Sequence, residues 1–363
     1  MSVSTPPHVV VVGRGIAGAY TAWAFRKRGC HVSWWGDARR GASHVAAGMF
    51  NPVSFRRIVE VWNAEAHLKT MRATLQEMER TLGLEGRVLH DVPVLKVLAN
   101  EDYRLTWDSR WEEGHGVCQW ATPSAPSPSN HVHAPHGVGR VHAAGWVDLP
   151  LLLRALEALW ADEGRLVNRS WEVADGVPEG ADWVVDCRGV GASEELAQGG
   201  LKVQPNHGDV LTVSTPGTLG LNTAGCNVNN GKWLLPMGVR GERMWWRLGA
   251  TYGWAQTTPE PSPDAQEELL AHMAQAWTAE GRSAWEELRV EAHQSGLRPA
   301  SPDRRPMVGP WPGQPSGVAM LNGLGTRGVL VGAAASDALV AWCLDGQALP
   351  GDIDPRRFKG FKK

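Results

Sequence analysis

The pattern of apolar and polar positions near the start of the chain predicts a strand followed directly by a helix. Residues 8–12, His-Val-Val-Val-Val, form a short apolar run typical of a buried strand. A glycine-rich segment at 13–18 separates this run from a helix-like stretch at 19–28. Residues 30–35 again have strand character, so this part of the sequence predicts a βαβ unit whose parallel strands are joined by a right-handed crossover.

Later segments repeat this β/α character, with short strand-like stretches between them. Apolar residues spaced three and four apart from Leu68 to Leu82 predict an amphipathic helix that Gly83 ends. Further helices are predicted at 151–160, 265–277 and 329–344. Further strands are predicted at 92–99, 181–189, 210–213, 233–235, 244–249 and 318–321. The short strands around residues 210–249 indicate an antiparallel sheet. Because β/α segments lie at both ends and in the middle, we expect two interleaved domains.

The glycine-rich segment is Gly-Arg-Gly-Ile-Ala-Gly, and its position between a strand and a helix is typical of dinucleotide binding. Gly13 allows the tight turn, and Gly15 lets a pyrophosphate approach the backbone because no Cβ is present. Gly18 lets the helix pack closely on the strand. Free N–H groups at Ile16 and Ala17 and the helix dipole would favour negative charge. The motif predicts a bound dinucleotide without saying which one.

Composition narrows the class of protein. The 363 residues favour two domains, and 43% hydrophobic with 20% charged residues is ordinary for a soluble enzyme. A net charge of −2 argues against a nucleic-acid partner. The five cysteines show neither zinc-ligand spacing nor a disulfide framework. We find no signal peptide and no apolar run long enough to span a bilayer, so we expect a cytoplasmic protein without a membrane segment.

Two residue types are unusually frequent or clustered. Four histidines, His131, His133, His136 and His142, lie in or beside a Pro-, Ser- and Gly-rich stretch at 121–139. No carboxylate or cysteine accompanies them at ligand spacing, so we expect a surface loop and no metal site. The nineteen tryptophans are expected to serve packing, with an aromatic-lined substrate pocket as the alternative.

Seven further segments follow the glycine loop in a fixed order. They lie at 42–49, 144–148, 183–189, 249–252, 296–299, 303–309 and 322–328. In this order and spacing they resemble the D-amino-acid oxidase family of FAD-dependent oxidoreductases, which includes glycine oxidase and sarcosine oxidase. The resemblance spans essentially the whole chain. It implies an α/β fold: a Rossmann-type FAD-binding domain (1–85, 140–200 and 295–363), interleaved with a smaller α+β substrate domain on an antiparallel sheet (86–139 and 201–294).

The resemblance also implies the contacts of a bound FAD. Beyond the glycine motif, the implied contacts are Asp37, Arg39, Arg40, Ser43, Ala47, Gly48, Met49, Val173, Cys187 and Gly189. A second glycine-rich turn would add Gly323, Gly325, Thr326, Arg327, Gly328 and Val329. Met49 would lie against the isoalloxazine ring. The helix after the second turn would face the flavin N1–C2=O region, where its dipole stabilises negative charge.

The chain departs from the family pattern at two places. An acidic residue usually follows the second strand at once to bind the adenosine ribose, but here Gly36 intervenes and Asp37 comes one residue late. Either Asp37 reaches the ribose, or backbone and water replace it. Arg39 and Arg40 keep an NADP-dependent reductase as an alternative, although that class would not explain the second glycine turn. His44 is one residue out of place for a covalent flavin link, so we expect non-covalent FAD.

The substrate residues follow from the same resemblance. Arg298 lies where the family often places the arginine that binds a substrate carboxylate, and a guanidinium matches a carboxylate in a bidentate manner. Tyr252, predicted on a short strand, either bonds the substrate or is a sheet aromatic with a surface hydroxyl. Arg56 and Arg57 either bind an anionic substrate or are solvated loop charges.

Together these features predict an enzyme that oxidises the C–N bond of a small amine or amino acid. A hydride would pass from the substrate carbon to flavin N5, and the imine product would then be hydrolysed. Two alternatives stay open beside the reductase. One is an FAD-dependent tRNA-modification enzyme acting on a carboxymethylaminomethyl group, and the other is a flavoprotein without catalytic activity.

Overall fold

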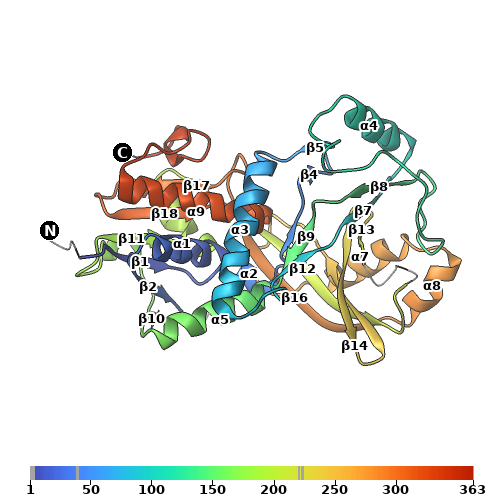
Figure 1. Cartoon of the computed structure of the whole chain (residues 1–363), viewed down its shortest axis with the longest axis horizontal. Helices are drawn as coiled ribbons and strands as arrows, with labels where there is room; N and C mark the ends of the chain where they lie inside the picture. Colours follow the sequence, from blue (N-terminus) through green and yellow to red (C-terminus); the bar gives the residue numbers. More distant parts are fainter. Residues whose placement is uncertain (1–4, 38–40, 220, 222–224, 363) are drawn as a thin grey trace.

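The computed structural model describes residues 5–37, 41–219, 221 and 225–362, which form two lobes with one main sheet each (Figure 1). The sheet of the first lobe, which we call the parallel sheet, has the order β10-β2-β1-β11-β18-β17. Its strands are parallel except for the edge strand β17. Their bounds are β1 His8–Val12, β2 His31–Gly36, β10 Leu166–Asn168, β11 Trp183–Asp186, β17 Met307–Pro310 and β18 Val318–Asn322.

Side chains alternate along each strand of the parallel sheet, so both of its faces carry apolar residues, and the long helices cover one of them. Val9 and Val11 of β1 face a large core shared with the helices, whereas Val10 and Val12 face a second core on the other side. The helices of the first core are α1 Ile16–Lys27, α3 Ala64–Leu82, α5 Leu149–Asp162 and α9 Gly328–Asp345. The second core includes Trp35, Trp171 and Leu196, the last from the short helix α6 Ser193–Gln198.

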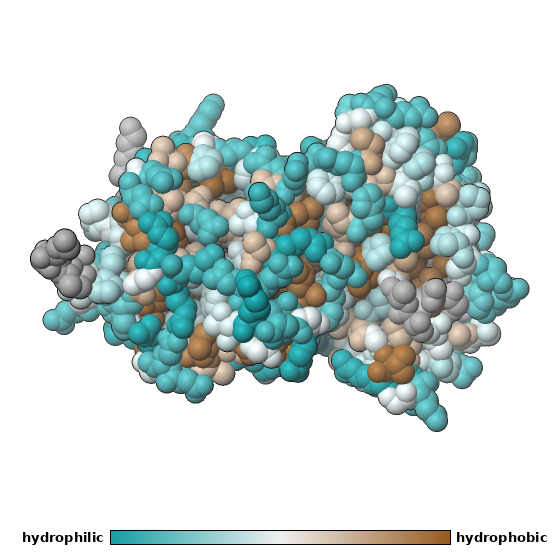
Figure 2. All heavy atoms as spheres, in the orientation of Figure 1, coloured by the Kyte–Doolittle hydropathy of each residue, from teal (hydrophilic) through white to brown (hydrophobic). Residues whose placement is uncertain are grey.

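The sheet of the second lobe, which we call the antiparallel sheet, has the order β16-β12-β15-β14-β13-β7-β8. All pairings are antiparallel except that of β13 with β7. The bounds are β7 Val94–Val97, β8 Val138–Val141, β12 Gln204–Thr215, β13 Asn227–Asn229, β14 Trp233–Arg240, β15 Arg243–Gly249 and β16 Arg289–Ala300. In the space-filling view the outline narrows between the two lobes, and hydrophilic residues cover much of this face (Figure 2).

The two faces of the antiparallel sheet have different partners. The outer face packs Leu211, Leu234 and Trp246 against the helices α7 Pro263–Ala274 and α8 Ala279–Glu286. The inner face packs Val210 and Leu235 against residues of the first lobe, including Ala47 and Trp146. Smaller elements complete the chain: α2 Ala42–Val45, α4 Glu101–Glu112, β3 Met49–Phe50, β4 Val53–Ser54, β5 Val59–Glu60, β6 Leu89–Asp91 and β9 Gly145–Val147.

The predicted fold class is confirmed, with differences in the extent of single elements. Helix α1 begins at Ile16, directly after Gly15, rather than at residue 19. Strands β12 and β16 have 12 residues each, although only 210–213 was predicted as a strand in that region. Polar side chains interrupt their apolar pattern, which hides their length. The predicted domain boundary at 295 falls inside β16.

Two predictions about single segments are wrong. Tyr252 does not lie on a strand, because β15 ends at Gly249. In the described part of the chain, the stretch Gly325–Asp345 is a helix long and apolar enough to cross a membrane, contrary to the expectation that none exists. More than half of that stretch is buried, and α9 packs on α1 and α3. A helix buried on several sides needs apolar residues around most of its circumference.

The contact of α1 with β1 leaves no room for a side chain at Gly18. A Cβ there would lie 1.8 Å from the carbonyl oxygen of Gly13, and that atom belongs to rigid backbone. We therefore expect Gly18→Ala to lower the free energy of unfolding by about 3 kcal/mol, the upper part of the range for overpacked cores. Denaturant unfolding measures this. Gly217→Ala is the control, since a Cβ there meets nothing within 4 Å; equal stability of the two variants would contradict the prediction.

Candidate functional site

The start of α1 presents open backbone groups at the carboxyl edge of the parallel sheet. Gly15 is the N-cap residue, no side chain caps it, and the first turn contains no acidic residue. The Ile16 N–H is not free as predicted, because it donates to Oγ of Ser43, at 3.0 Å, and Ser43 lies in α2. Trp34 fixes the preceding turn by donating from Nε1 to the Gly13 carbonyl oxygen, at 2.9 Å. This arrangement is suited to an anion, because free N–H groups and the helix dipole point to one place.

A second helix N-terminus lies beside the first. Helix α9 begins at Gly328 without a side-chain cap and without an acidic residue in its first turn. A Cβ at Gly328 would lie 3.2 Å from Cγ2 of Ile16, so the two helix starts are in contact. The Tyr20 hydroxyl donates to the Val329 carbonyl oxygen, at 3.1 Å, and ties α1 to α9. Two helix dipoles therefore direct positive potential into the same region.

The segment from Ala46 to Met49 is held from both lobes. Gly48 has φ +69°, and a Cβ there would lie 2.0 Å from the Val147 carbonyl oxygen. Arg247, on the inner face of β15, donates from Nη2 to the Val45 oxygen at 2.6 Å and from Nη1 to the Ala46 oxygen at 3.3 Å. Burial lowers the pKa of Arg247, opposed by the charge of Asp148. A charged side chain from the second lobe thus fixes a loop of the first.

Met49 is placed by an asparagine of the antiparallel sheet. Nδ2 of Asn227 donates to Sδ of Met49, at 3.0 Å. Oδ1 of Asn227 is buried and has no partner among the described residues. No sequence pattern distinguishes Asn227 from other asparagines, whereas Arg247 carries a weak signal, as a charge inside the apolar strand Met-Trp-Trp-Arg-Leu-Gly.

Arg298 lies on β16 with its guanidinium against the sheet. Nη1 donates to Oδ1 of Asn206 at 3.0 Å, to the His207 carbonyl oxygen at 3.3 Å and to the Thr251 carbonyl oxygen at 3.4 Å. The guanidinium carbon lies 4.8 Å from the ring centroid of Tyr252, which is 59% exposed. Burial lowers the pKa of Arg298, while Tyr252 and Asp209 oppose the shift. Nη2 keeps no partner among the described residues and remains available to a ligand.

Two glycines make room for the large side chains on this inner face. A Cβ at Gly208 would lie 2.1 Å from Nη2 of Arg298, and a Cβ at Gly249 would lie 2.5 Å from the Trp233 indole. Trp233 belongs to an apolar cluster with Ala47, Trp146, Val210, Leu235 and Ala250. The structure therefore brings a cationic group and an apolar wall onto the sheet face toward Met49. Trp233 was not predicted individually, because nineteen tryptophans gave no means of choosing among them.

The other residues predicted to contact FAD lie at the carboxyl edge of the parallel sheet, and several of them already hydrogen-bond to other parts of the protein. Asp37 follows β2 directly, while Arg39 and Arg40 lie outside the described residues. The Val173 N–H already donates to Oε1 of Glu195, at 2.8 Å. Cys187 is buried, its thiol donates to the Thr21 hydroxyl at 3.6 Å, and burial raises its pKa to about 12. The Gly189 carbonyl oxygen accepts a bond from Nδ2 of Asn322, at 3.0 Å, beside the second glycine turn.

That second turn is followed by a group of cations. Gly323 and Gly325 have φ +73° and +54°, and Thr326 is exposed. Arg327 is half-buried; its backbone N–H donates to the Leu324 carbonyl oxygen at 3.1 Å, whereas its guanidinium makes no hydrogen bond or ion pair with the described residues. Its pKa is lowered by burial and then by the charges of Arg304 and Arg57.

Arg56 and Arg57 are both exposed. The four histidines at 131–142 do not form a metal site: within the described ranges no three His, Cys, Asp or Glu side chains are arranged to hold a metal ion.

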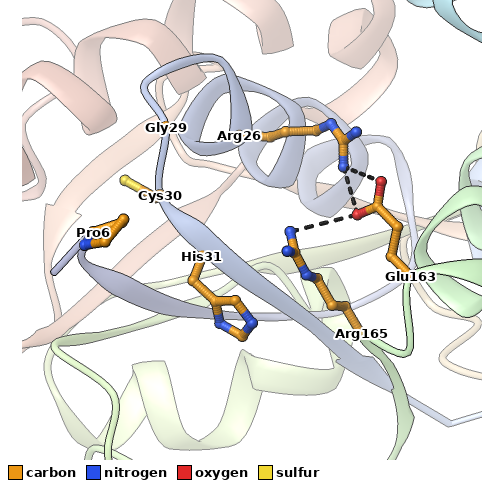
Figure 3. A pocket seen from close by; sticks show the side chains of 7 residues that line it. All are labelled: Pro6, Arg26, Gly29, Cys30, His31, Glu163 and Arg165. Carbon is orange, nitrogen blue, oxygen red and sulfur yellow. Dashed lines mark hydrogen bonds and ion pairs between the residues drawn. The ribbon is translucent and has the colours of Figure 1, made fainter.

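A surface hollow elsewhere on the first lobe lies away from the two glycine turns, and its charged residues pair with one another. Figure 3 shows Glu163 between Arg26 of α1 and Arg165, with His31 and Cys30 beside them. Oε2 of Glu163 lies 2.6 Å from Nη1 of Arg26 and 3.4 Å from Nη1 of Arg165. The hollow is at the start of β2, the edge opposite the glycine turn, and its charges tie α1 to the end of α5.

Comparison with known proteins assigns the fold to a family. The family described as FAD dependent oxidoreductase, DAO, matches residues 8–342. The chain belongs to the DAO family. Its likeness to solved structures is in the fold: glycine oxidase from Geobacillus kaustophilus has a TM-score of 0.74 at 21% identity, covering 98% of both chains. Iminodiacetate oxidase from Chelativorans sp. BNC1 has a TM-score of 0.72 at 20% identity, covering 97% of this chain and 98% of that one.

Curated relatives fall into two groups. The tRNA 5-methylaminomethyl-2-thiouridine biosynthesis bifunctional protein MnmC of Delftia acidovorans (strain DSM 14801 / SPH-1) is 27% identical over 395 residues, covering 96% of this chain. This DAO-family chain spans only 59% of the length of that relative. The D-amino-acid oxidase of Streptomyces coelicolor (strain ATCC BAA-471 / A3(2) / M145) is 28% identical over 301 residues, covering 80% of this chain and 83% of the relative.

The residues present fit FAD, the cofactor of the family. The two adjacent, uncapped helix starts supply N–H groups for a pyrophosphate and for the negative charge of a reduced flavin. Gly15 keeps a side chain away from the first of them, and the apolar cluster around Trp233 suits a flat ring system. The chain therefore combines membership of a family described as FAD dependent oxidoreductase with residues that fit this cofactor. Individual contacts, from Asp37 to Val329, stay predictions.

Ser43 offers a test of the pyrophosphate end. Because its Oγ accepts from the Ile16 N–H, its own proton is free to donate to a phosphate oxygen. We expect Ser43→Ala to weaken FAD binding about fivefold, the equivalent of about 1 kcal/mol for one hydrogen bond. Fluorescence titration of deflavinated protein with FAD measures this, and Ser43→Thr should bind like the wild type. Unchanged affinity in Ser43→Ala would place Ser43 outside the site.

Proposed function

We propose that this DAO-family enzyme oxidises the C–N bond of a small amine or amino acid that carries a carboxylate. The observation that carries the proposal is Arg298, whose Nη1 is committed to three protein oxygens while Nη2 is free. A guanidinium held in this way is suited to binding a carboxylate with fixed orientation. The neighbouring apolar wall suits the carbon side of such a substrate.

The protein's tasks in the reaction follow from these residues. Bound FAD supplies the hydride acceptor, N5. Arg298 anchors the carboxylate and so orients the C–H bond beside the amine. Trp233 and Leu235, both buried, exclude water from that side. The open N-terminus of α9 stabilises the negative charge of the reduced state. An amine bound in its neutral form requires no dedicated base, and none of the side chains of the apolar cluster titrates.

A second candidate function is oxidation of a carboxymethylaminomethyl group on tRNA. Two observations favour it: the MnmC relative aligns with 96% of the chain, and Arg57, Arg304 and Arg327 form a group of cations without carboxylate partners among the described residues. Arginines of this kind are suited to neutralising RNA phosphates. Both candidates use Arg298 for a carboxylate, so they differ only in what the amine is attached to.

The substrate class is tested by anaerobic bleaching of the flavin. We expect amino acids or N-alkyl glycines in a panel to bleach it, because each combines an amine with a carboxylate within reach of one anchor. The second candidate is tested in parallel with tRNA, whose binding should weaken steeply as salt rises. Bleaching by tRNA alone would replace the proposed substrate class with the second. Bleaching by no amine and no tRNA would overturn both.

Replacing Arg298 tests the anchor itself. Arg298→Leu should raise the KM for a carboxylated amine on the order of 10- to 100-fold, since a charge-assisted hydrogen bond is worth about 1.5–3 kcal/mol. Steady-state kinetics with that amine and with its methyl ester measure the effect, and the ester should respond little. Arg298→Lys is the matched variant, because it keeps the charge without the planar fork. Equal KM values in wild type and Arg298→Leu would remove Arg298 from the site.

A further inference from the structure

A buried polar cluster lies on the outer face of the antiparallel sheet, directly behind Arg298. Its centre is Asp209 of β12, which is 1% exposed and lies on that face between the polar His207 and the apolar Leu211. Oδ1 accepts from Nε2 of His293 at 2.9 Å and from the Ser262 N–H at 3.1 Å. Oδ2 accepts from Oγ1 of Thr251 at 2.8 Å, and Nδ1 of His207 lies 3.4 Å from it. A buried carboxylate is costly unless it is fully bonded, and these partners offset that cost for Asp209.

Thr251 links this carboxylate to the substrate side of the sheet. Besides donating to Oδ2, the Thr251 hydroxyl accepts from the Asp209 N–H at 2.9 Å, and the Thr251 N–H donates to the Asp209 carbonyl oxygen at 3.4 Å. The Thr251 carbonyl oxygen then accepts from Nη1 of Arg298, and the next residue, Tyr252, lies against the guanidinium. Asp209 and the arginine are therefore connected through one residue.

The segment after Thr251 is tied to β12 by further bonds. The His207 N–H donates to the Gly253 carbonyl oxygen at 2.8 Å, and the Gly253 N–H donates back to the His207 oxygen at 2.9 Å. That same His207 oxygen is an acceptor for Arg298. The acceptors of Nη1 thus come from two segments, 206–207 and 251. The His207–Gly253 bonds and the Asp209–Thr251 bonds hold these two segments together.

We propose that Asp209 is a positioning residue: by fixing Thr251 and Tyr252 against β12, it sets the orientation of the Arg298 guanidinium toward a carboxylate ligand. Asp209 itself touches no ligand. The inference deepens the proposed function, on which it rests for the identity of the substrate, and it concerns carboxylate binding rather than the oxidation step.

The two carboxylate oxygens allow this role to be separated from a merely structural one. Oδ2 serves Thr251, whereas Oδ1 serves His293 and the Ser262 N–H at the N-cap of α7. Removing the Thr251 hydroxyl removes the bond between Asp209 Oδ2 and the residue that contacts Arg298, and leaves the two bonds of Oδ1 in place. Removing His293 cuts one Oδ1 bond and leaves the path intact.

The test uses the FAD-loaded enzyme and two readouts. The first is the dissociation constant of acetate, a carboxylate without an amine, measured by perturbation of the flavin spectrum. The second is the separation of KM from kcat for a bleaching amine. We expect Asp209→Asn and Thr251→Val to raise both the acetate constant and KM about tenfold with kcat within about twofold of the wild type, because the guanidinium is displaced while the chemistry is unchanged. Thr251→Ser should restore wild-type values.

Control variants decide between positioning and folding. His293→Gln should lower thermal stability and leave acetate binding unchanged. Gly208→Ala should weaken acetate binding by a route independent of Asp209, because the new Cβ would displace Nη2 of Arg298. Three results would overturn the inference. In the first, Asp209→Asn and Thr251→Val bind acetate as tightly as the wild type. In the second, His293→Gln weakens acetate binding as much as they do, and in the third, replacing Arg298 leaves acetate binding unchanged. If acetate behaves as expected but no amine bleaches the flavin, the inference stands and the proposed function fails.

Discussion

The close contact of α1 with β1 and with α9 is the constraint on which the rest of the structure depends. Gly18 brings α1 onto the backbone of Gly13, and Gly328 brings α9 onto Ile16. These contacts place two helix N-termini side by side at one edge of the parallel sheet. A side chain at Gly18 would push α1 off the Gly13 backbone, and a Cβ at Gly328 would require Ile16 to shift, so both glycines keep the two helix starts close enough to act on one anionic group.

The second lobe completes the site by holding a loop of the first. Arg247 bonds the carbonyl oxygens of Val45 and Ala46, and Asn227 bonds the sulfur of Met49. The loop from Val45 to Met49 is therefore positioned by a sheet that belongs to the other half of the molecule. This explains why a buried charge is kept in β15 despite its desolvation cost: the segment it holds has carbonyl groups that no neighbouring strand pairs.

The sequence was sufficient for features whose signal is local. The glycine loop, the βαβ unit and the turn before α9 each combine glycines with an adjoining apolar run, so their structure could be predicted without knowing the fold. Arg298 could be proposed as a carboxylate anchor because it lies in a short recognisable motif. Trp233, Asn227, Arg247 and Asp209 were not found, because their roles come from strand register. The place of Trp233 depends on its pairing opposite Gly249 in the neighbouring strand. The place of Asp209 depends on the hydrogen bond from Thr251, which follows the end of β15.

The interleaving of the chain has a consequence for synthesis on the ribosome. Helix α1 is complete by Lys27, yet its partner α9 begins only at Gly328. Tyr20, 1% exposed in the finished protein, has no cover from α9 until about three hundred further residues have been made. The part of α1 that α9 covers therefore stays without its native partner during most of translation, even though α3 and α5 of the same core are made earlier, and exposed apolar surface of this kind favours aggregation.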